Sequence, residues 1–161
     1  KLLFSRDRDI SDFIYSSYFG RYEIYQPLFP SISLKLATEI GSYFNSDNID
    51  SLNPFAMGGS DGFMGYSRNE LSAPHYQIIT TGITYNWHKK WYANAGAQFL
   101  RYSDRELWGV LKNWEHCFYA GIGFNNRFLP ARLTLSLNQD RELNSFLNLG
   151  YDFDIFRFSR K

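Results

Sequence analysis

The stretch RLTLSLN, residues 132–138, alternates polar side chains with leucines. Successive side chains of a β-strand point to opposite faces of a sheet, so a period of two predicts a strand with one apolar and one polar face. Leu133, Leu135 and Leu137 make the apolar face, and Arg132 begins the polar one. We therefore expect this segment to belong to a sheet whose two faces lie in different environments.

The same alternation runs through most of the chain, whereas helical periodicity is scarce. Many of the alternating segments have about ten residues or more, which is the length that a tilted strand needs to cross the hydrocarbon layer of a membrane. Strands of soluble proteins average only about 5–6 residues. The sequence predicts seven strands: 12–26, 32–41, 75–87, 91–102, 118–125, 132–138 and 147–155.

Composition narrows the class of protein. The chain has 161 residues, enough for one domain over residues 1–161, and its net charge of +1 gives no reason to expect a nucleic-acid partner. Phe, Tyr and Trp make up 19% of the chain, a content typical of membrane β-barrels with aromatic girdles. Cys117 is the only cysteine, so disulfides within the chain and zinc-type cysteine clusters are excluded. No apolar run of 18 residues predicts a transmembrane helix, and we expect no cofactor or metal.

The connections between these segments alternate between short and long. The links at 27–30, 88–90 and 126–130 are short, whereas 45–73 is very long. Outer-membrane barrels have this asymmetry, with short periplasmic turns and longer outer loops. We therefore expect the last strand, 147–155, to run toward the short turns and to leave the C-terminus in the periplasm.

The expected fold is all-β, an antiparallel transmembrane β-barrel of which this chain is the C-terminal part, about seven to eight strands of a larger barrel. Seven strands do not close a single-chain bacterial barrel. Residues 1–10 would supply part of another strand, the chain would be a piece of a larger barrel, or a second copy would close the sheet. The alternative is a soluble lipocalin-like barrel with its apolar face around a ligand.

Two groups of side chains favour the membrane barrel. The polar faces carry charges and amides that suit a wet or plugged lumen, and the lumen-facing positions are Glu39, Asn94, Gln98, Asp152 and Asp154. Aromatic residues near strand ends suit an interfacial girdle, and they are Tyr25, Phe44, Trp87, Trp91, Phe99, Phe124, Phe156 and Phe158.

The sequence GGSDG, residues 58–62, fits the G-x-S-x-G pattern of serine hydrolases. A nucleophile elbow needs a strand before the serine, a helix after it and a base within reach. The flanking sequence predicts neither element, and the candidate bases are His75, His88 and His116. We therefore expect no catalytic residue, with the glycines allowing positive φ in a folded-back loop. A soluble hydrolase that uses Ser60 is the competing interpretation.

The segment 54–71, PFAMGGSDGFMGYSRNEL, resembles a signature of the bacterial surface antigen superfamily, which includes the Bam and Tam assembly barrels and the two-partner-secretion transporters. The family pattern is a glycine pair, a short spacer and Val-Arg-Gly-Tyr or Val-Arg-Gly-Phe, in a long loop that folds back into the barrel. Gly58-Gly59 match the pair and Gly65-Tyr66 the last two positions. Family members have five strands after the loop, and five segments follow it here. The resemblance implies packing in the lumen by loop residues Gly58, Gly59, Phe63, Met64, Gly65, Tyr66 and Arg68.

The chain departs from the family pattern at Met64, which replaces the arginine. In the transporters this arginine locks the loop against an acidic residue of the barrel wall. The strand expected to face it, 91–102, offers Asn94 and Gln98 and no acid. Losing both partners together avoids a buried unpaired charge. Arg68 is then either a solvated loop residue or a partner for an acid on the polar face.

This variant of the motif looks most like the barrel of patatin-like phospholipase autotransporters. The resemblance implies that the chain lies in the bacterial outer membrane, where it anchors an N-terminal patatin-like phospholipase passenger and is a candidate to translocate it. The implied partners are the lipid bilayer and the barrel assembly machinery, with Phe156 or Phe158 as the C-terminal assembly signal and a homo-oligomer as one way to close the sheet. The alternatives are a general outer-membrane protein insertase or transporter of the same superfamily, and a self-contained small or dimeric outer-membrane barrel.

Overall fold

A computed structural model describes the backbone of six segments of the chain: 2–8, 14–44, 54–103, 113–126, 129–150 and 152–158. Side chains are described for residues 17–43, 54–103, 113–126 and 129–150. Every regular element in these segments is a β-strand, and every pairing is antiparallel. The expectation of an all-β antiparallel architecture is therefore confirmed.

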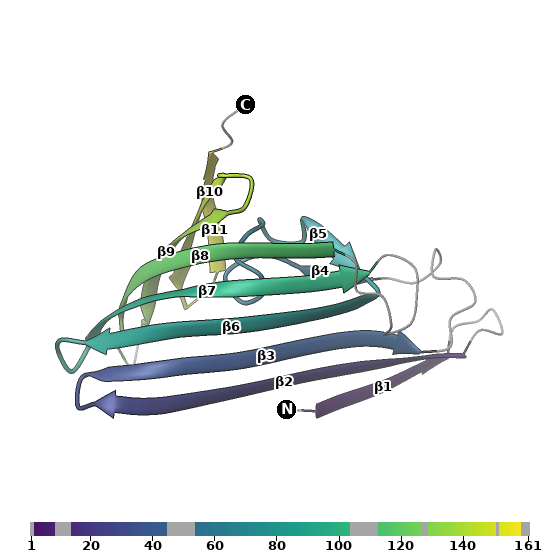
Figure 1. Ribbon diagram of the computed structural model, residues 1–161, viewed down its shortest axis with the longest axis horizontal. Coiled ribbons are helices and arrows are strands. Elements are labelled where there is room, and N and C mark those ends of the chain that lie inside the picture. Colours follow the sequence, from purple (N-terminus) through teal and green to yellow (C-terminus); the bar gives the residue numbers. More distant parts are fainter. Residues whose placement is uncertain are drawn as a thin grey trace.

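Nine strands form one strongly twisted sheet in the order β1-β2-β3-β6-β7-β8-β9-β10-β11, and a small β4–β5 hairpin interrupts the sequence (Figure 1). The described sheet is open, with β1 and β11 at its two edges, and does not close into a barrel. The strands are β1 Leu2–Arg8, β2 Ile14–Phe29, β3 Ile32–Phe44, β4 Phe55–Met57, β5 Leu71–Ala73, β6 His75–Asn86, β7 Trp91–Ser103, β8 Asn113–Phe124, β9 Ala131–Asn138, β10 Leu143–Leu149 and β11 Asp152–Phe158.

The sheet differs from the seven predicted strands at both ends of the chain. Residues 2–8 form the additional strand β1, which pairs with β2 from Leu2↔Gly20 to Arg8↔Ile14. The predicted strand 147–155 is wrong, because a turn at Gly150 (φ 71°) divides it between β10 and β11. In the described part of the chain, six strands of the main sheet therefore follow the long loop, and the expectation of five is wrong.

The extra reversal changes where the last strand ends. Phe158 is the register partner of Leu143, the first residue of β10. Leu143 follows the turn after Asn138. This turn lies at the same ends of the strands as the end of β3 and the beginning of β6. The described C-terminal strand thus runs toward the strand ends that are joined by the long connections. The expectation that it runs toward the short turns is wrong.

The predicted alternation places two different surfaces on the sheet. On β9, Thr134 and Ser136 are buried on one face, whereas Leu133 and Leu135 are exposed on the other. Ladder partners share a face, so these assignments extend from β9 across the sheet to β3. We call the polar side, which the β4–β5 segment covers, the loop face, and the other side the outward face.

Most of the large exposed apolar side chains belong to the outward face. Phe118 is 59% exposed and Leu135 is 45% exposed, and exposed apolar residues of other strands lie beside them on this face. Tyr25, expected in an aromatic girdle, instead lies under the Lys35 ammonium, 5.7 Å from its ring centroid, on the loop face. The other outward apolar residues that are exposed include Leu36, Ile79, Ile83, Phe99, Ile122, Leu133 and Leu137.

Candidate functional site: the inward-folded loop

Residues 54–73 form a folded-back hairpin. Its base is the β4–β5 pair, with Phe55 opposite Ala73, and its glycine pair makes the sharp bend that follows β4. Gly58 has φ 114° and Gly59 has φ 90°, conformations that side-chain-bearing residues rarely adopt. The Gly59 N–H donates to the Tyr66 carbonyl over 2.9 Å and closes the tip of the hairpin.

The interior of the hairpin is packed around one aromatic ring. Phe63 is 0% exposed and belongs to an apolar cluster with Met57, Met64 and Tyr76. A Cβ atom on Gly65 would collide with the Phe63 ring. Glycine is therefore required at position 65 by close packing, because the ring occupies the space that any side chain would need.

The centre of the loop is held by a neutral amide of the wall. The Met64 N–H donates to Gln98 Oε1 over 2.7 Å, and Gln98 Nε2 donates to the Gly62 carbonyl over 3.0 Å. Gln98 Nε2 also lies 3.1 Å from Thr80 Oγ1, which orients the amide. Gln98 is 4% exposed, so these bonds satisfy polar groups that water does not reach.

Three further polar side chains bind loop carbonyls from the next strands. Ser136 Oγ on β9 donates to the Met64 carbonyl. The Gly65 carbonyl accepts two hydrogen bonds, from Asn138 Nδ2 over 3.1 Å and from Asn144 Nδ2 over 2.9 Å. The loop backbone is therefore hydrogen-bonded to β7, β9 and β10 at successive residues.

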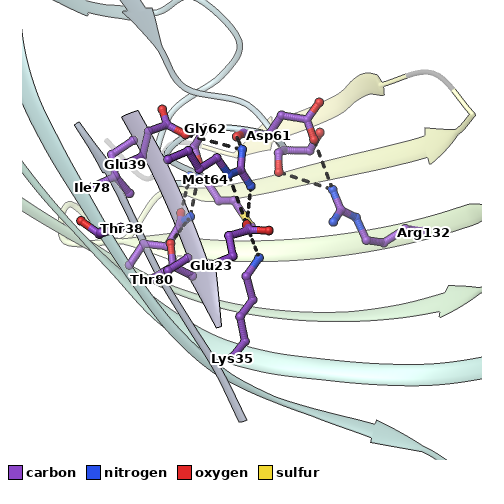
Figure 2. Close-up of a pocket in the computed structure, with 14 residues that line it drawn as sticks. Glu23, Lys35, Thr38, Glu39, Asp61, Gly62, Met64, Ile78, Thr80 and Arg132 are labelled. Atoms are coloured by element: carbon purple, nitrogen blue, oxygen red, sulfur yellow. Dashed lines mark hydrogen bonds and ion pairs between the residues drawn. The ribbon is translucent and has the colours of Figure 1, made fainter. Parts of the chain in front are cut away.

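Two arginines from distant strands converge on the loop tip. Arg21 Nη1 on β2 donates to the Asp61 carbonyl over 3.3 Å. From β9, Arg132 Nη2 donates to the Ser60 carbonyl over 3.4 Å and lies 3.9 Å from Asp61 Oδ1 (Figure 2). Four strands separate β2 from β9, which is about 24 Å in a flat sheet. The sheet must therefore curve around the loop for both arginines to reach it.

A polar cleft of about 60 Å³ remains between the loop tip and strands β2 and β3. Opposite charges alternate along its wall: Lys35 Nζ lies 3.4 Å from Glu23 Oε1, and Arg21 lies 2.7 Å from the same carboxylate and 3.5 Å from Glu39. Figure 2 shows Glu23 and Lys35 on one side of the cleft and Arg132 with Asp61 on the other. The volume suffices for a few water molecules and excludes a substrate of ordinary size.

The remaining loop residues predicted from the sequence lie at the surface of the hairpin. Tyr66 is half-buried, and its hydroxyl is hydrogen-bonded to Glu115. Burial and this neighbouring carboxylate raise the pKa of the Tyr66 phenol, so it stays a protonated donor. Arg68 is exposed and lies over Gly59. Glu39 is bound by the Tyr76 hydroxyl over 2.8 Å, in addition to Arg21.

The other predicted lumen-facing residues differ in what they contact. Asn94 lies on the loop face, where its Oδ1 atom is buried and makes no hydrogen bond within the described residues. Asp152 and Asp154 pair in register with Asn148 and Phe146, and their side chains lie outside the described part of the chain. The same holds for Phe156 and Phe158, which pair with Ser145 and Leu143.

The geometry around Ser60 is not that of a nucleophile. Ser60 is buried in the loop tip, whereas His75 hydrogen-bonds Ser42 over 2.8 Å on the outward face. His88 and His116 are exposed, and His116 lies against Phe118, also on the outward face. His75 and His116 therefore lie on the face opposite the loop, and this placement does not favour either of them as a base for Ser60.

The wall residues that bind the loop most directly were missed as site residues. They are Arg21, Arg132, Ser136, Asn138 and Asn144. Each occupies a polar position of an alternating strand, so the period of two predicts its face. It does not predict which loop carbonyl the side chain reaches, because that depends on the curvature of the sheet.

Among the described residues, no helix is long and apolar enough to span a membrane, and no group of three or more His, Cys, Asp or Glu side chains is placed to hold a metal ion. The site is thus a loop bound to a curved wall by uncharged hydrogen bonds at its centre and by arginines at its tip. No protein-family model, curated protein or solved structure matches the chain.

Proposed function

We propose that the chain is part of an outer-membrane β-barrel, in which the outward face contacts lipid and loop 54–73 fills the interior. The observation that supports it most is the separation of polar and apolar surfaces across one layer of strands. The loop face carries buried polar groups and charges, and the outward face carries exposed leucine, isoleucine and phenylalanine side chains. In water this arrangement is costly, because apolar area is exposed while polar groups are buried.

The apolar band on the outward face has the height expected of a membrane strand. On β7 it lies between Trp91 and Arg101, which is ten residues or about 33 Å along the strand. A tilt of about 35–45° gives a height of about 23–27 Å, close to the roughly 25 Å band of membrane barrels. Aromatic rings lie at both ends: Trp91 is 4.8 Å from Phe124, and Trp114 lies under Arg101 at 4.3 Å.

The open edges impose a further requirement on the proposal. Unpaired strand amides have no partner in hydrocarbon, so β1 and β11 must pair with further strands. These strands come from more of the same polypeptide or from a second copy. The mass of the assembly in detergent separates the two cases, because only the second is a multiple of the chain.

The proposed role is to anchor an N-terminal patatin-like phospholipase passenger and to assist its export. This role rests on the resemblance at Gly58-Gly59 and Gly65-Tyr66. The tight packing of these glycines in the loop supports the proposal that they serve the structural purpose that the motif implies. The gene sequence upstream of Lys1 tests it. A hydrolase domain there supports the passenger, and repeated periplasmic modules favour an insertase or transporter.

Membrane residence is tested by refolding the protein with preformed phospholipid vesicles. We expect it to float with the vesicles in a density gradient and to migrate differently on gels before and after heating. A protein that stays monodisperse in plain buffer, with Leu135 and Leu149 protected from solvent, would contradict the proposal.

A further inference from the structure

The outward face carries an apolar groove of about 700 Å³ across strands β6 to β9. Its floor consists of Ala93, Ala95 and Ala120, and its walls rise at Ile83 on one side and Leu135 on the other. The register places these residues in one row, with Ile83 opposite Ala95 and Ala120 opposite Leu135. The side chains of this row are therefore large on β6 and β9 and small on β7 and β8, and a depression results along β7 and β8.

An aromatic cluster lies beyond one end of the groove. Trp91, two residues from Ala93 on the same face, stacks on Trp87 with centroids 6.3 Å apart and 17° between the rings. It also contacts Phe124, and Tyr85 lies 6.4 Å from Trp87. Rings of this kind favour the level of lipid headgroups, where one edge meets water and the other meets hydrocarbon.

The turn beyond this cluster is basic. Lys89 and Lys90 are exposed in the turn between β6 and β7. The sequences of the β6–β7 and β8–β9 connections, 86–91 and 124–131, contain no Asp or Glu. Lysine stems can extend along apolar surface while their ammonium groups stay in water, and this behaviour suits the binding of an anion at the level of the aromatic rings. The charge at this end is complementary to a phosphate group.

We propose that the groove binds one acyl chain of an anionic phospholipid and that Lys89 and Lys90 bind its phosphate group. The inference rests on the proposed membrane residence. Three surfaces follow one another toward the start of β7: the apolar groove, the aromatic cluster and the two lysines. In the same order they suit the acyl chain, the headgroup level and the phosphate group of such a lipid. Near an anionic membrane each lysine changes the binding preference roughly fivefold.

The test uses the refolded protein in phosphatidylcholine vesicles that contain brominated phosphatidylglycerol or, separately, brominated phosphatidylcholine. Bromine atoms quench tryptophans in contact, and Trp87 and Trp91 lie at the groove. We expect quenching by the anionic lipid at a lower mole fraction, and a roughly fivefold loss of this preference in Lys90→Gln. Arg141→Gln is the control. Arg141 is an exposed cation in a turn at the opposite ends of the strands, so its removal should leave the preference unchanged.

A second variant tests the groove itself. Ala95→Leu raises its floor and should weaken the preference while both lysines remain. Equal quenching by the two lipids in the unaltered protein, or an unchanged preference in Lys90→Gln and Ala95→Leu, would overturn the lipid site. A dimer that Ala95→Leu dissociates would show that a second copy occupies the groove, and this also overturns it. Failure to float with vesicles is a different result, because it contradicts membrane residence.

Discussion

The same strands form both faces of the sheet, but the two faces differ in which kind of side chain is buried and which is exposed. On the loop face, Gln98, Ser136 and Asn144 are buried and bound to loop backbone. On the outward face, Leu133 and Phe118 are exposed. The difference teaches that the polar side is the packed side of the described sheet, and it is the reason for proposing that the exposed apolar side contacts lipid.

Leu135→Arg should have the largest effect, because it places a charge at the middle of β9 on the outward face. In a bilayer an arginine near the midplane costs about 2–4 kcal/mol, falling to about 0–1 near the interface. Leu149→Arg, at the end of β10, is the matched control. Urea unfolding of the vesicle-inserted proteins measures both. Equal stabilities would contradict the proposal that Leu135 lies near the middle of a bilayer and Leu149 near its interface.

Gly65→Leu should disrupt the loop face by overpacking. Because the Phe63 ring occupies the space beside Gly65, either the ring or the loop must move, at a cost of about 2–3 kcal/mol. Ala56→Leu adds its bulk at an exposed position of the same hairpin and should be nearly neutral. Barrel assembly and heat-modifiable migration report the outcome. If Gly65→Leu assembles normally, the loop does not pack inward in the membrane.

Gln98→Ala should loosen the centre of the loop. It leaves the Met64 N–H and the Gly62 carbonyl without their partner, which costs about 1–2 kcal/mol. Hydrogen–deuterium exchange of the Met64 amide should accelerate by roughly tenfold as a result. Asn94→Ala on the same strand, whose Oδ1 atom makes no hydrogen bond within the described residues, is the control. If the Met64 amide exchanged at a similar rate in both variants, the hydrogen bonds between Gln98 and the loop would not be what protects it.

Asp61→Asn should have the smallest effect. The Arg132–Asp61 distance is 3.9 Å and the Asp61 side chain is 73% exposed, so the pair contributes less than about 1 kcal/mol. We expect slightly faster proteolysis of the loop tip at low salt, and no difference from the unaltered protein at high salt, where the charges are screened. A large loss of stability would show that the tip holds the wall strands together.

The sequence predicted the strands best where apolar and polar residues alternate on opposite faces. The segment 132–138 was identified almost residue for residue as β9. The predicted strand 147–155 was wrong because Leu147 pairs in register with Phe153, so odd-numbered positions meet odd-numbered positions on either side of the Gly150 turn. A pattern with a period of two therefore continues through the turn without a break.

Sequence alone determined the alternation of the strands, the glycine-rich nature of the loop and the polarity of each face, since these follow from the direction of neighbouring side chains along one strand. Tertiary structure alone decided which carbonyl Gln98, Arg21 and Arg132 reach. Contacts between residues 34 to 79 positions apart depend on how far the sheet curves. Curvature is a property of many strands together, and no single segment encodes it.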